Sequence, residues 1–389
     1  FGWIREIQLH QDSPMATTLL LVGGSIRAAA FSARRVGLQP WGADLFGDAD
    51  LALAGRSFQR IADYRDMPAI SEQGPPGPWI YTGALENRPG LVEKIAGLRH
   101  LWGNSAKVLR RVRDPLAVYQ MLTAANVPCP RIGGHHSAHW LQKPIAGAGG
   151  KGISPWTGPK IRRGHYLQEI IEGDSCAAVY VANKGRADLV GVTLQLVGQS
   201  WLHAGPFQYC GSIGPLQLEA ELQQAFLQLG NALAAGFSLQ GLFGVDCIVR
   251  DNIPWPVEVN PRYTASMEVL ELSTHSSVLL KHARVFDPSF PACDSRRENA
   301  SGTPAIIGKA ILFARAPLTF PRQGPWSRAL AETTDFWAMP AFADIPSPGQ
   351  PIPVHQPILT LFARNDSISG CTKQLQQLAA DLDHVLFPS

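Results

Sequence analysis

The sequence predicts an α/β protein, α+β in its later part, with more than one domain. Three observations lead to this prediction: a length of 389 residues, a strand-helix-strand pattern with a glycine turn over residues 17–43, and a strand-rich stretch over residues 138–270 that a helix near 216–235 interrupts. Because most domains hold about 100–200 residues, this length suits two or three of them.

The composition is that of an ordinary globular protein, with 45% hydrophobic and 17% charged residues. The formal net charge is only +3, and lysines and arginines form no long run. We therefore expect neither nucleic acid nor a membrane surface as a partner. No apolar stretch reaches the roughly 18 residues that a membrane-spanning helix needs.

The first residues and the cysteines favour a cytoplasmic protein. Residues 1–14 carry charges and no apolar core, so they do not read as a secretory signal. We predict that they form a disordered extension and that the fold starts near Met15. The six cysteines include no CxxC pair, which favours reduced thiols over a zinc site or a disulfide framework.

The elements near the start predict a small α/β domain with a parallel sheet. An apolar run over 17–22 predicts a buried strand that ends in two glycines, and residues 26–36 predict a helix rich in small side chains. Further strands are expected at 38–43 and 79–82. Together these elements predict a domain over residues 15–104.

The remaining elements alternate strands, helices and loops. Asp114, followed by a proline, predicts the N-terminus of a helix over 114–126. Residues 287–304 are rich in Pro, Ser, Asp and Arg, which indicates a loop. After this loop the sequence predicts a strand over 305–313 and a final helix near 370–385.

A glycine-rich loop follows a strand that carries Lys143. The segment after this lysine reads Pro-Ile-Ala-Gly147-Ala-Gly149-Gly150-Lys151-Gly. Glycines let backbone N–H groups approach phosphate oxygens closely, and a nearby lysine neutralises their charge. Taken alone, the loop could equally be a hairpin that binds nothing, and it lacks the spacing of a P-loop.

Two more segments carry polar side chains at strand positions. Gln168, Glu169 and Ile171 precede a polar turn and could contact an adenine ring, although a plain hairpin edge explains them equally well. Two strands joined by a turn place Asp246 opposite Glu258, and alternation puts Asn260 on the same face as Glu258. Oxygen ligands of this kind suit Mg²⁺, with a purely structural polar network as the alternative.

In this order, the features resemble the ATP-grasp superfamily, in particular the predicted ATP-dependent carboligases related to biotin carboxylase. The resemblance covers residues 105–275. It implies an ATP-grasp domain over 105–300 with a glycine-loop lid over about 130–185. By the same resemblance, residues 15–104 form a Rossmann-like pre-ATP-grasp domain, and residues 301–389 form a small β-rich C-terminal domain.

The resemblance also implies roles for ATP and for Mg²⁺ or Mn²⁺. Asp246, Glu258 and Asn260 are the expected metal ligands, while the glycine loop closes over the triphosphate. Ser175 stands where many members carry a glutamate that binds ribose. The expected nucleotide contacts are Lys107, Lys143, Gly147, Gly149, Gly150, Gln168, Glu169, Ile171 and Ser175.

The reaction that the resemblance favours is ligation of a carboxylate to an amine through an acyl phosphate. Arg262 is expected to steady the oxyanion, with Lys151 as a further catalytic candidate. Ser25 and Arg27, at the start of the first helix, are candidates for binding a substrate carboxylate. Related carboligases suggest an amino acid such as glutamate or tyrosine, used in the biosynthesis of a methanopterin- or methanofuran-type one-carbon cofactor. A homodimer stays open.

Two other functions stay open. A biotin-type carboxylase needs, by resemblance, a glutamate four residues after Arg262, where this sequence has Ser266. An ATP-binding regulator without catalysis would not need the complete set of charged side chains that this sequence carries. Dependence of ADP release on bicarbonate would favour the carboxylase, and nucleotide binding without turnover would favour the regulator.

Overall fold

The computed structural model describes residues 17–55, 57–133, 139–291, 304–331 and 335–388. The extension predicted over 1–14 lies outside these residues. Among the helices of the described residues, none is long and apolar enough to cross a membrane.

The chain begins with a four-stranded parallel sheet, as predicted. Its strand order is β3-β2-β1-β4. Strand β1 is buried on both faces, which explains why its sequence is a continuous apolar run rather than an alternating one. The strands and the helices around them are β1 Thr18–Val22, α1 Arg27–Arg35, β2 Gln39–Asp44, β3 Phe58–Arg60, α2 Met67–Gln73, β4 Trp79–Tyr81 and α3 Pro89–Ala96.

A small three-stranded sheet follows two helices. Asp114 caps the second helix, accepting hydrogen bonds from the backbone N–H groups of Leu116 and Ala117 at 2.9 and 3.3 Å, as its position predicts. The sheet has the order β6-β5-β7, and the glycine loop connects β5 to β6. The elements are α4 Ala106–Val112, α5 Pro115–Ala124, β5 Trp140–Pro144, β6 Ser154–Pro155 and β7 His165–Glu169.

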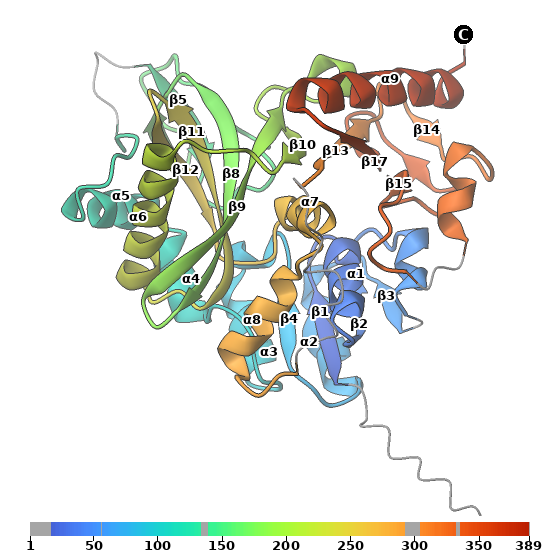
Figure 1. Ribbon diagram of the computed structural model, residues 1–389, viewed down its shortest axis with the longest axis horizontal. Helices are drawn as coiled ribbons and strands as arrows, with labels where there is room; N and C mark the ends of the chain where they lie inside the picture. Colours follow the sequence, from blue (N-terminus) through green and yellow to red (C-terminus); the bar gives the residue numbers. More distant parts are fainter. Residues whose placement is uncertain (1–16, 56, 134–138, 292–303, 332–334, 389) are drawn as a thin grey trace, which may run out of the picture.

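The largest sheet has eight antiparallel strands in the order β12-β11-β8-β9-β10-β13-β17-β15. Helix α6 packs against its β8–β9 side, and helix α9 covers β13 and β17 (Figure 1). The elements are β8 Asp174–Asn183, β9 Arg186–Val197, β10 Tyr209–Gly214, α6 Ala220–Phe237, β11 Gly241–Arg250, β12 Ile253–Asn260, β13 Ile306–Phe313, β15 Phe342–Ala343, β17 Pro357–Asn365 and α9 Ile368–Leu386.

The late strands thus extend the sheet of the central ones. Strand β10 pairs with β13 over Gly211–Gly214 and Ile307–Ala310. A two-stranded ribbon, β14 Leu318–Thr319 with β16 Pro351–Ile352, lies beside them. Hydrogen bonding is therefore continuous across the predicted boundary at residue 301, and the domain limits stay predictions.

Two helices, α7 Ala265–Thr274 and α8 Val278–Phe286, stand where the large sheet meets the N-terminal sheet (Figure 1). The prediction of a strand-rich stretch up to residue 270 is wrong at its end, because α7 already begins at Ala265. Residues 266–273 are all buried, so this helix has no polar face to reveal its period.

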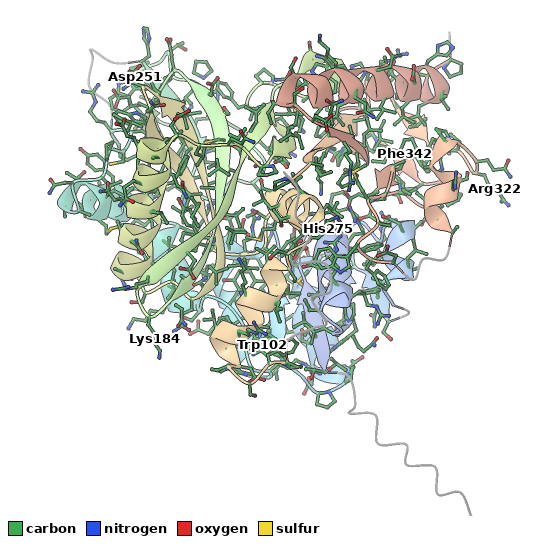
Figure 2. The ribbon with its side chains drawn as sticks, in the orientation of Figure 1. Trp102, Lys184, Asp251, His275, Arg322 and Phe342 are labelled. Carbon is green, nitrogen blue, oxygen red and sulfur yellow. The ribbon has the colours of Figure 1, made fainter. Side chains whose placement is uncertain are left out.

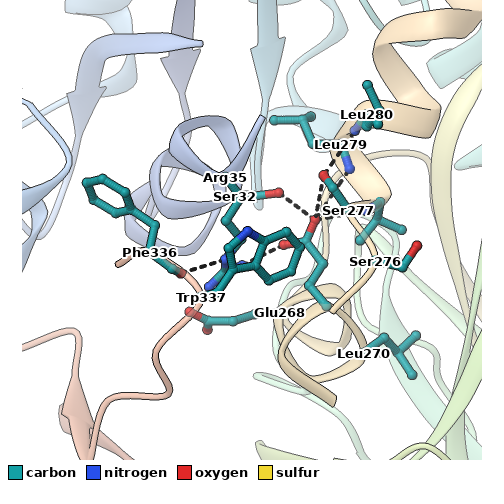
Figure 3. A network of polar contacts seen from close by, with 12 residues as sticks. Ser32, Arg35, Glu268, Leu270, Ser276, Ser277, Leu279, Leu280, Phe336 and Trp337 are labelled. Atoms are coloured by element: carbon teal, nitrogen blue, oxygen red, sulfur yellow. Dashed lines mark hydrogen bonds and ion pairs between the residues drawn. The ribbon is translucent and has the colours of Figure 1, made fainter. Parts of the chain in front are cut away.

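The carboxylates of α7 are matched by cations and donors from α1 and α8. Glu271 accepts from Arg35 Nη1 at 2.6 Å, from Ser32 Oγ at 2.7 Å and from the backbone N–H of Val278 at 2.8 Å. Figure 3 shows Ser32, Arg35 and Ser277 close together, with dashed lines for the polar contacts around them. The polar residues of α7 therefore join the N-terminal sheet to the central one.

Candidate active site

A cavity of about 560 Å³ lies between the three-stranded sheet and the large sheet. It brings together most of the residues that the sequence predicts for the nucleotide and the metal: Lys143, Gly149, Gly150, Gln168, Glu169, Ile171, Ser175, Asp246, Glu258 and Asn260. The predicted catalytic residue Arg262 lines it too. A smaller cavity of about 70 Å³ shares Lys143, Gly150 and Glu258 with it and also contains Gly147 and Lys151. The two cavities are therefore adjacent parts of one site.

Lys143 lies on β5 and is buried. Its Nζ donates to Gln168 Oε1 at 2.9 Å and to the carbonyl oxygen of Val257 at 3.0 Å. Burial lowers the pKa of Lys143, and the charges of Glu258 and Asp246 oppose that shift. The ammonium group thus connects the small sheet to the strand that carries the predicted metal ligands.

The glycine loop rests on the large sheet. Gly149 and Gly150 have φ angles of 60° and 77°, and a Cβ at Gly150 would lie 1.8 Å from the carbonyl oxygen of Phe207. The backbone N–H of Tyr209 donates to the carbonyl oxygen of Gly149 at 3.3 Å. Only glycine at position 150 lets the loop approach the β9–β10 connection this closely.

The side chains expected to contact the adenosine part of ATP differ in whether they already have hydrogen-bond partners in the protein. The amide of Gln168 is 5% exposed and is fully engaged, since its Nε2 also donates to Val257 O at 3.2 Å. Glu169 accepts a hydrogen bond from Arg131 Nη2 at 2.8 Å, and this bond lowers the pKa of Glu169. Ile171 and Ser175 line the cavity. Ile171 and Ser175 are therefore the side chains of this set that stay available to a base or a ribose.

Asp246 and Glu258 face each other across the β11–β12 pair, as the sequence predicts. Figure 2 shows Asp251, in the turn of this hairpin, at the outer edge of the molecule. Asp246 Oδ1 accepts from Gln195 Nε2 at 2.8 Å, and its Oδ2 accepts from Asn260 Nδ2 at 3.1 Å. The two carboxylates and the amide oxygen of Asn260 therefore line one part of the cavity.

The two carboxyl groups differ in acidity. Burial and the charge of Glu258 raise the pKa of Asp246 to about 7. Burial also acts to raise the pKa of Glu258, but the charges of Arg113 and Lys143 outweigh it and hold this pKa below its usual range. A divalent cation would relieve the repulsion between the carboxylates, and an all-oxygen donor set suits Mg²⁺. The residues present thus fit the implied metal.

No group of three or more His, Cys, Asp and Glu side chains within the described ranges is placed to hold a metal ion. The metal site that the sequence predicts differs from such a group, because it has two carboxylates, Asp246 and Glu258, and the amide of Asn260.

A second basic residue at this site is Arg113, which follows α4. Its Nη1 donates to Glu258 Oε1 at 2.8 Å, and its Nη2 donates to Asn87 Oδ1 at 2.9 Å and to the carbonyl oxygen of Gly147 at 3.3 Å. Lys107, the residue expected here, is exposed on α4 and lines neither cavity in the described part of the chain. The structure thus favours Arg113 over Lys107 as the partner of Lys143.

Arg262 lies between the large cavity and a separate cavity of about 260 Å³. Its Nε donates to Glu86 Oε1 at 2.8 Å, and its Nη2 donates to Asn260 Oδ1 at 3.2 Å. Thr264 and Ala265 also line both cavities. The guanidinium group is therefore held at the border between two binding spaces.

The 260 Å³ cavity, here called the second cavity, lies where the start of α1 meets strands β13 and β17. Ser25 lines it together with Asp48, Lys309 and Asp344, and its role as a substrate contact stays a prediction. Arg27 does not line it. Its side chain is fully buried and is engaged by Glu268 at 2.6 Å and by Asp344 at 3.1 Å. The expectation that Arg27 binds a substrate carboxylate is therefore corrected: this cation is neutralised inside the protein.

Sequence reasoning missed Arg113, Gln195 and Asp48. Arg113 immediately precedes the capping residue Asp114, which was a usable signal for a basic side chain near the site. Gln195 stands in a segment without a recognisable motif, so its place follows only from the fold. Asp48 belongs to the segment Asp44-Leu-Phe-Gly-Asp48, which resembles the pre-ATP-grasp domain, but that resemblance assigned it no role.

Comparisons with known proteins agree with this geometry. Residues 112–266 match the family model of the ATP-grasp domain. An uncharacterized protein of Methanocaldococcus jannaschii is 23% identical over 293 residues, which cover 70% of this chain and 66% of that protein. The chain thus spans slightly less than two thirds of that relative.

Two solved structures share the fold of the chain. The L-amino acid ligase of Bacillus licheniformis is 16% identical with a TM-score of 0.66, over 94% of this chain and 97% of that one. The biotin carboxylase of Campylobacter jejuni, in a complex with β-γ-ATP, is 13% identical with a TM-score of 0.65, over 93% and 90%. At these identities the similarity concerns the fold alone.

Proposed function

Because residues 112–266 form an ATP-grasp domain and the chain has the ATP-grasp fold, we propose that it is an ATP- and Mg²⁺-dependent ligase that joins a carboxylate to an amine. Members of this superfamily are ATP-dependent ligases. In the proposed reaction, a carboxylate oxygen attacks the γ-phosphorus of ATP and ADP leaves. The amine nitrogen then attacks the acyl carbon, and phosphate leaves as the amide forms.

The observation that carries this proposal is the position of Arg262. Arg262 lines the 560 Å³ cavity that contains Lys143, Asp246 and Glu258, and it also lines the second cavity. A ligase needs the activated acid and the acceptor amine next to each other. A planar guanidinium at the border suits the oxyanion that forms when the two meet.

The other residues have roles in positioning and charge neutralisation. Lys143 and Arg113 would neutralise phosphate oxygens, and the backbone of Gly149 and Gly150 would close over them. Asp246, Glu258 and Asn260 would hold Mg²⁺, which supplies compensation for phosphate charge when it is bound. Positioning and charge compensation account for most of catalysis in phosphoryl transfer.

The carboxylase alternative has less support. Ser266 occupies the position where a carboxylase-like site needs its glutamate, and its Oγ is within 3.1 Å of Ser212 Oγ. Glu268, the next carboxylate along α7, is bound to Arg27 and Lys309. A base for bicarbonate is therefore missing from this part of the described chain.

The finer identity of the substrates is also part of the proposal. We propose an amino acid, such as glutamate or tyrosine, as one substrate, within the biosynthesis of a methanopterin- or methanofuran-type one-carbon cofactor. The fold shared with an L-amino acid ligase supports an amino acid. The resemblance to predicted carboligases supports the pathway.

A screen of ADP release tests the proposal. Purified protein with ATP and Mg²⁺ is given amino acids and primary amines, singly and in pairs. We expect ADP to form only when an acid and an amine are both present, in equal amount to the amide detected by mass spectrometry. ADP release that depends on bicarbonate alone would support the carboxylase instead.

A further inference from the structure

The second cavity is lined by two carboxyl groups, Asp48 and Asp344, and by two cations, Lys309 and Arg262, the latter paired with Glu86 at 2.8 Å. Cations and carboxyl groups form a cluster at its wall. The cations Arg27 and Lys309 are shared by four carboxyl groups, which are Asp48, Asp50, Asp344 and Glu268. Glu268 is bound by both cations, at 2.6 and 2.7 Å. The negative charge that is left over lies on the aspartates, and two of these, Asp48 and Asp344, line the cavity.

The aspartates differ in how far their oxygens are satisfied. Asp50 accepts from the backbone N–H groups of Ile345 and Asp344 at 2.9 and 3.1 Å. Asp344 accepts from Arg27 Nε and from Thr360 Oγ1. Asp48 is only 8% exposed, and its buried Oδ2 has no hydrogen-bond partner among the described residues. A buried carboxyl group with an unpartnered oxygen is costly, so Asp48, which lines the cavity, would be stabilised by a donor from a ligand.

Two further acceptors are unpartnered at the same cavity. The buried atoms Gln350 Oε1 and Thr264 Oγ1 also lack a partner in the described ranges. Burial and the charges of Asp344 and Asp50 raise the pKa of Asp48 well above its usual range, which shows how poorly its negative charge is compensated. The charge of Arg27 opposes this shift only in part, so Asp48 is the lining carboxyl group whose charge is compensated least.

The rest of the wall is apolar. Ala28, Phe46, Ile311, Ile358 and Leu359 supply hydrocarbon and aromatic surface. A volume of about 260 Å³ suits a small molecule. The complementary ligand therefore has a compact apolar body and one cationic end with several N–H donors.

We propose that the second cavity binds the amine substrate of the ligation as a primary ammonium, with Asp48 and Gln350 recognising the charged end and the apolar wall holding the body. The identification of the ligand as a substrate rests on the proposed ligase function. Asp48 is a specificity residue in this proposal and the amine is the substrate that it selects. Arg262, at the edge of the same cavity, leads from this site to the nucleotide cavity.

Binding of a probe amine tests the cavity without requiring turnover. We would titrate 2-phenylethylamine, and 2-phenylethanol as its neutral counterpart, into the full chain and measure affinity by calorimetry. The amine should bind and the alcohol should bind at least about tenfold more weakly, because a hydrogen bond to a charged group is lost. Asp48→Asn should weaken amine binding by about tenfold or more.

Controls separate recognition from folding. Asp48→Asn keeps the size of the side chain and removes a buried carboxyl group that burial destabilises, so its melting temperature should not fall. Asp251→Asn, an exposed change in the distant β11–β12 turn, should bind the amine like the wild type. Gln350→Ala, a substitution in a loop, should weaken the binding of the amine as well. Equal affinity for amine and alcohol, or unchanged amine binding in both Asp48→Asn and Gln350→Ala, would overturn the proposal.

The same proteins distinguish this inference from the proposed function. If the wild type binds the amine through Asp48 but no acid–amine pair yields ADP, ligation fails and the ammonium site stands. If ADP forms with an amine whose KM is the same in Asp48→Asn, ligation stands and the ammonium site is wrong. In an active enzyme we expect Asp48→Asn to raise the KM for the amine and to leave the KM for ATP unchanged.

Discussion

At the scale of single residues, the site depends on which charges face each other. Glu258 is held ionised by Arg113 and Lys143, while Asp246, across the strand pair, is driven toward protonation by burial and by Glu258. Lys143, Arg113 and Arg262 stand around these two acids. We propose that this arrangement compensates phosphate and metal charge on one small surface, so single substitutions should separate binding from turnover.

Glu258→Gln should lower turnover far more than it lowers nucleotide affinity. A neutral amide cannot compensate metal charge when the γ-phosphoryl group moves, so we expect kcat to fall by about tenfold or more. Steady-state kinetics and ATP titration measure the two effects. Glu172→Gln changes an exposed carboxylate of the same cavity and should stay close to wild type. Residual activity of Glu258→Gln near the wild-type value would place the metal elsewhere.

Arg113→Ala and Lys107→Ala form a matched pair that tests which basic residue serves the site. Arg113 touches Glu258 and the glycine loop, whereas Lys107 is exposed. We expect Arg113→Ala to lower kcat/KM for ATP by about tenfold or more and Lys107→Ala to change it less than twofold. The reverse order would restore the role that the sequence predicts for Lys107.

The sequence allowed some of these residues to be predicted and not others. The alternation in Glu258-Val-Asn260 was enough to place both polar side chains on one face. The fate of Arg27 could not be predicted, because its partner Glu268 lies 241 positions away. A short segment does not reveal whether a cation meets a substrate or a buried carboxylate.

At the scale of elements, helices α7 and α8 hold the halves of the molecule together. His282 on α8 is buried between the large sheet and the N-terminal part of the molecule. Its Nδ1 accepts from the backbone N–H of Leu242 at 2.9 Å, so its Nε2 donates to the carbonyl oxygen of Trp102 at 3.1 Å. Burial lowers the pKa of His282 to about 4. The neutral ring therefore joins β11 to the segment that follows β4.

Stability should fall in acid because of this histidine. Above pH 6.5 the ring is neutral in both states and has no effect on the pH dependence. Between pH 6.5 and 4 the unfolded chain binds the proton and the folded one does not, so the free energy of unfolding should drop by roughly 3 kcal/mol. Denaturant titrations at several pH values measure this slope.

His282→Gln supplies the control for the acid effect. It should cost about 1–3 kcal/mol at pH 7, because the two backbone partners lose good geometry. Its stability should then fall less steeply than that of the wild type between pH 6.5 and 4. Parallel curves for the two proteins would mean that other groups cause the acid sensitivity.

Elements with a clear period or a cap were predictable and those without were not. The helix that begins after Asp114 follows its capping signal, and the continuous apolar run of β1 follows from burial on both faces. Helix α7 was missed because its residues 266–273 are all buried, so no amphipathic pattern marks it. The buried carboxylates of that helix are explained by their ion pairs with Arg27, Arg35 and Lys309, which come from distant segments.

At the scale of the whole molecule, the ATP-grasp fold was predicted from an ordered set of motifs and is confirmed. The second cavity could not be predicted, because the start of α1 builds it together with strands β13 and β17, which begin about 280 and about 330 residues later in the chain. Three parts of the fold thus meet around Arg262, so the nucleotide site and the acceptor site that we propose lie next to each other.

Trapping of the activated acid tests the central claim most directly. The full chain is incubated with ATP, Mg²⁺, a substrate acid from the ADP screen, and hydroxylamine in place of the amine. Hydroxylamine attacks the acyl carbon and releases phosphate, so we expect a hydroxamate to form in equal amount to ADP, and none to form without ATP. ADP release that requires bicarbonate, with no hydroxamate from any acid in the screen, would contradict the ligase and support a carboxylase.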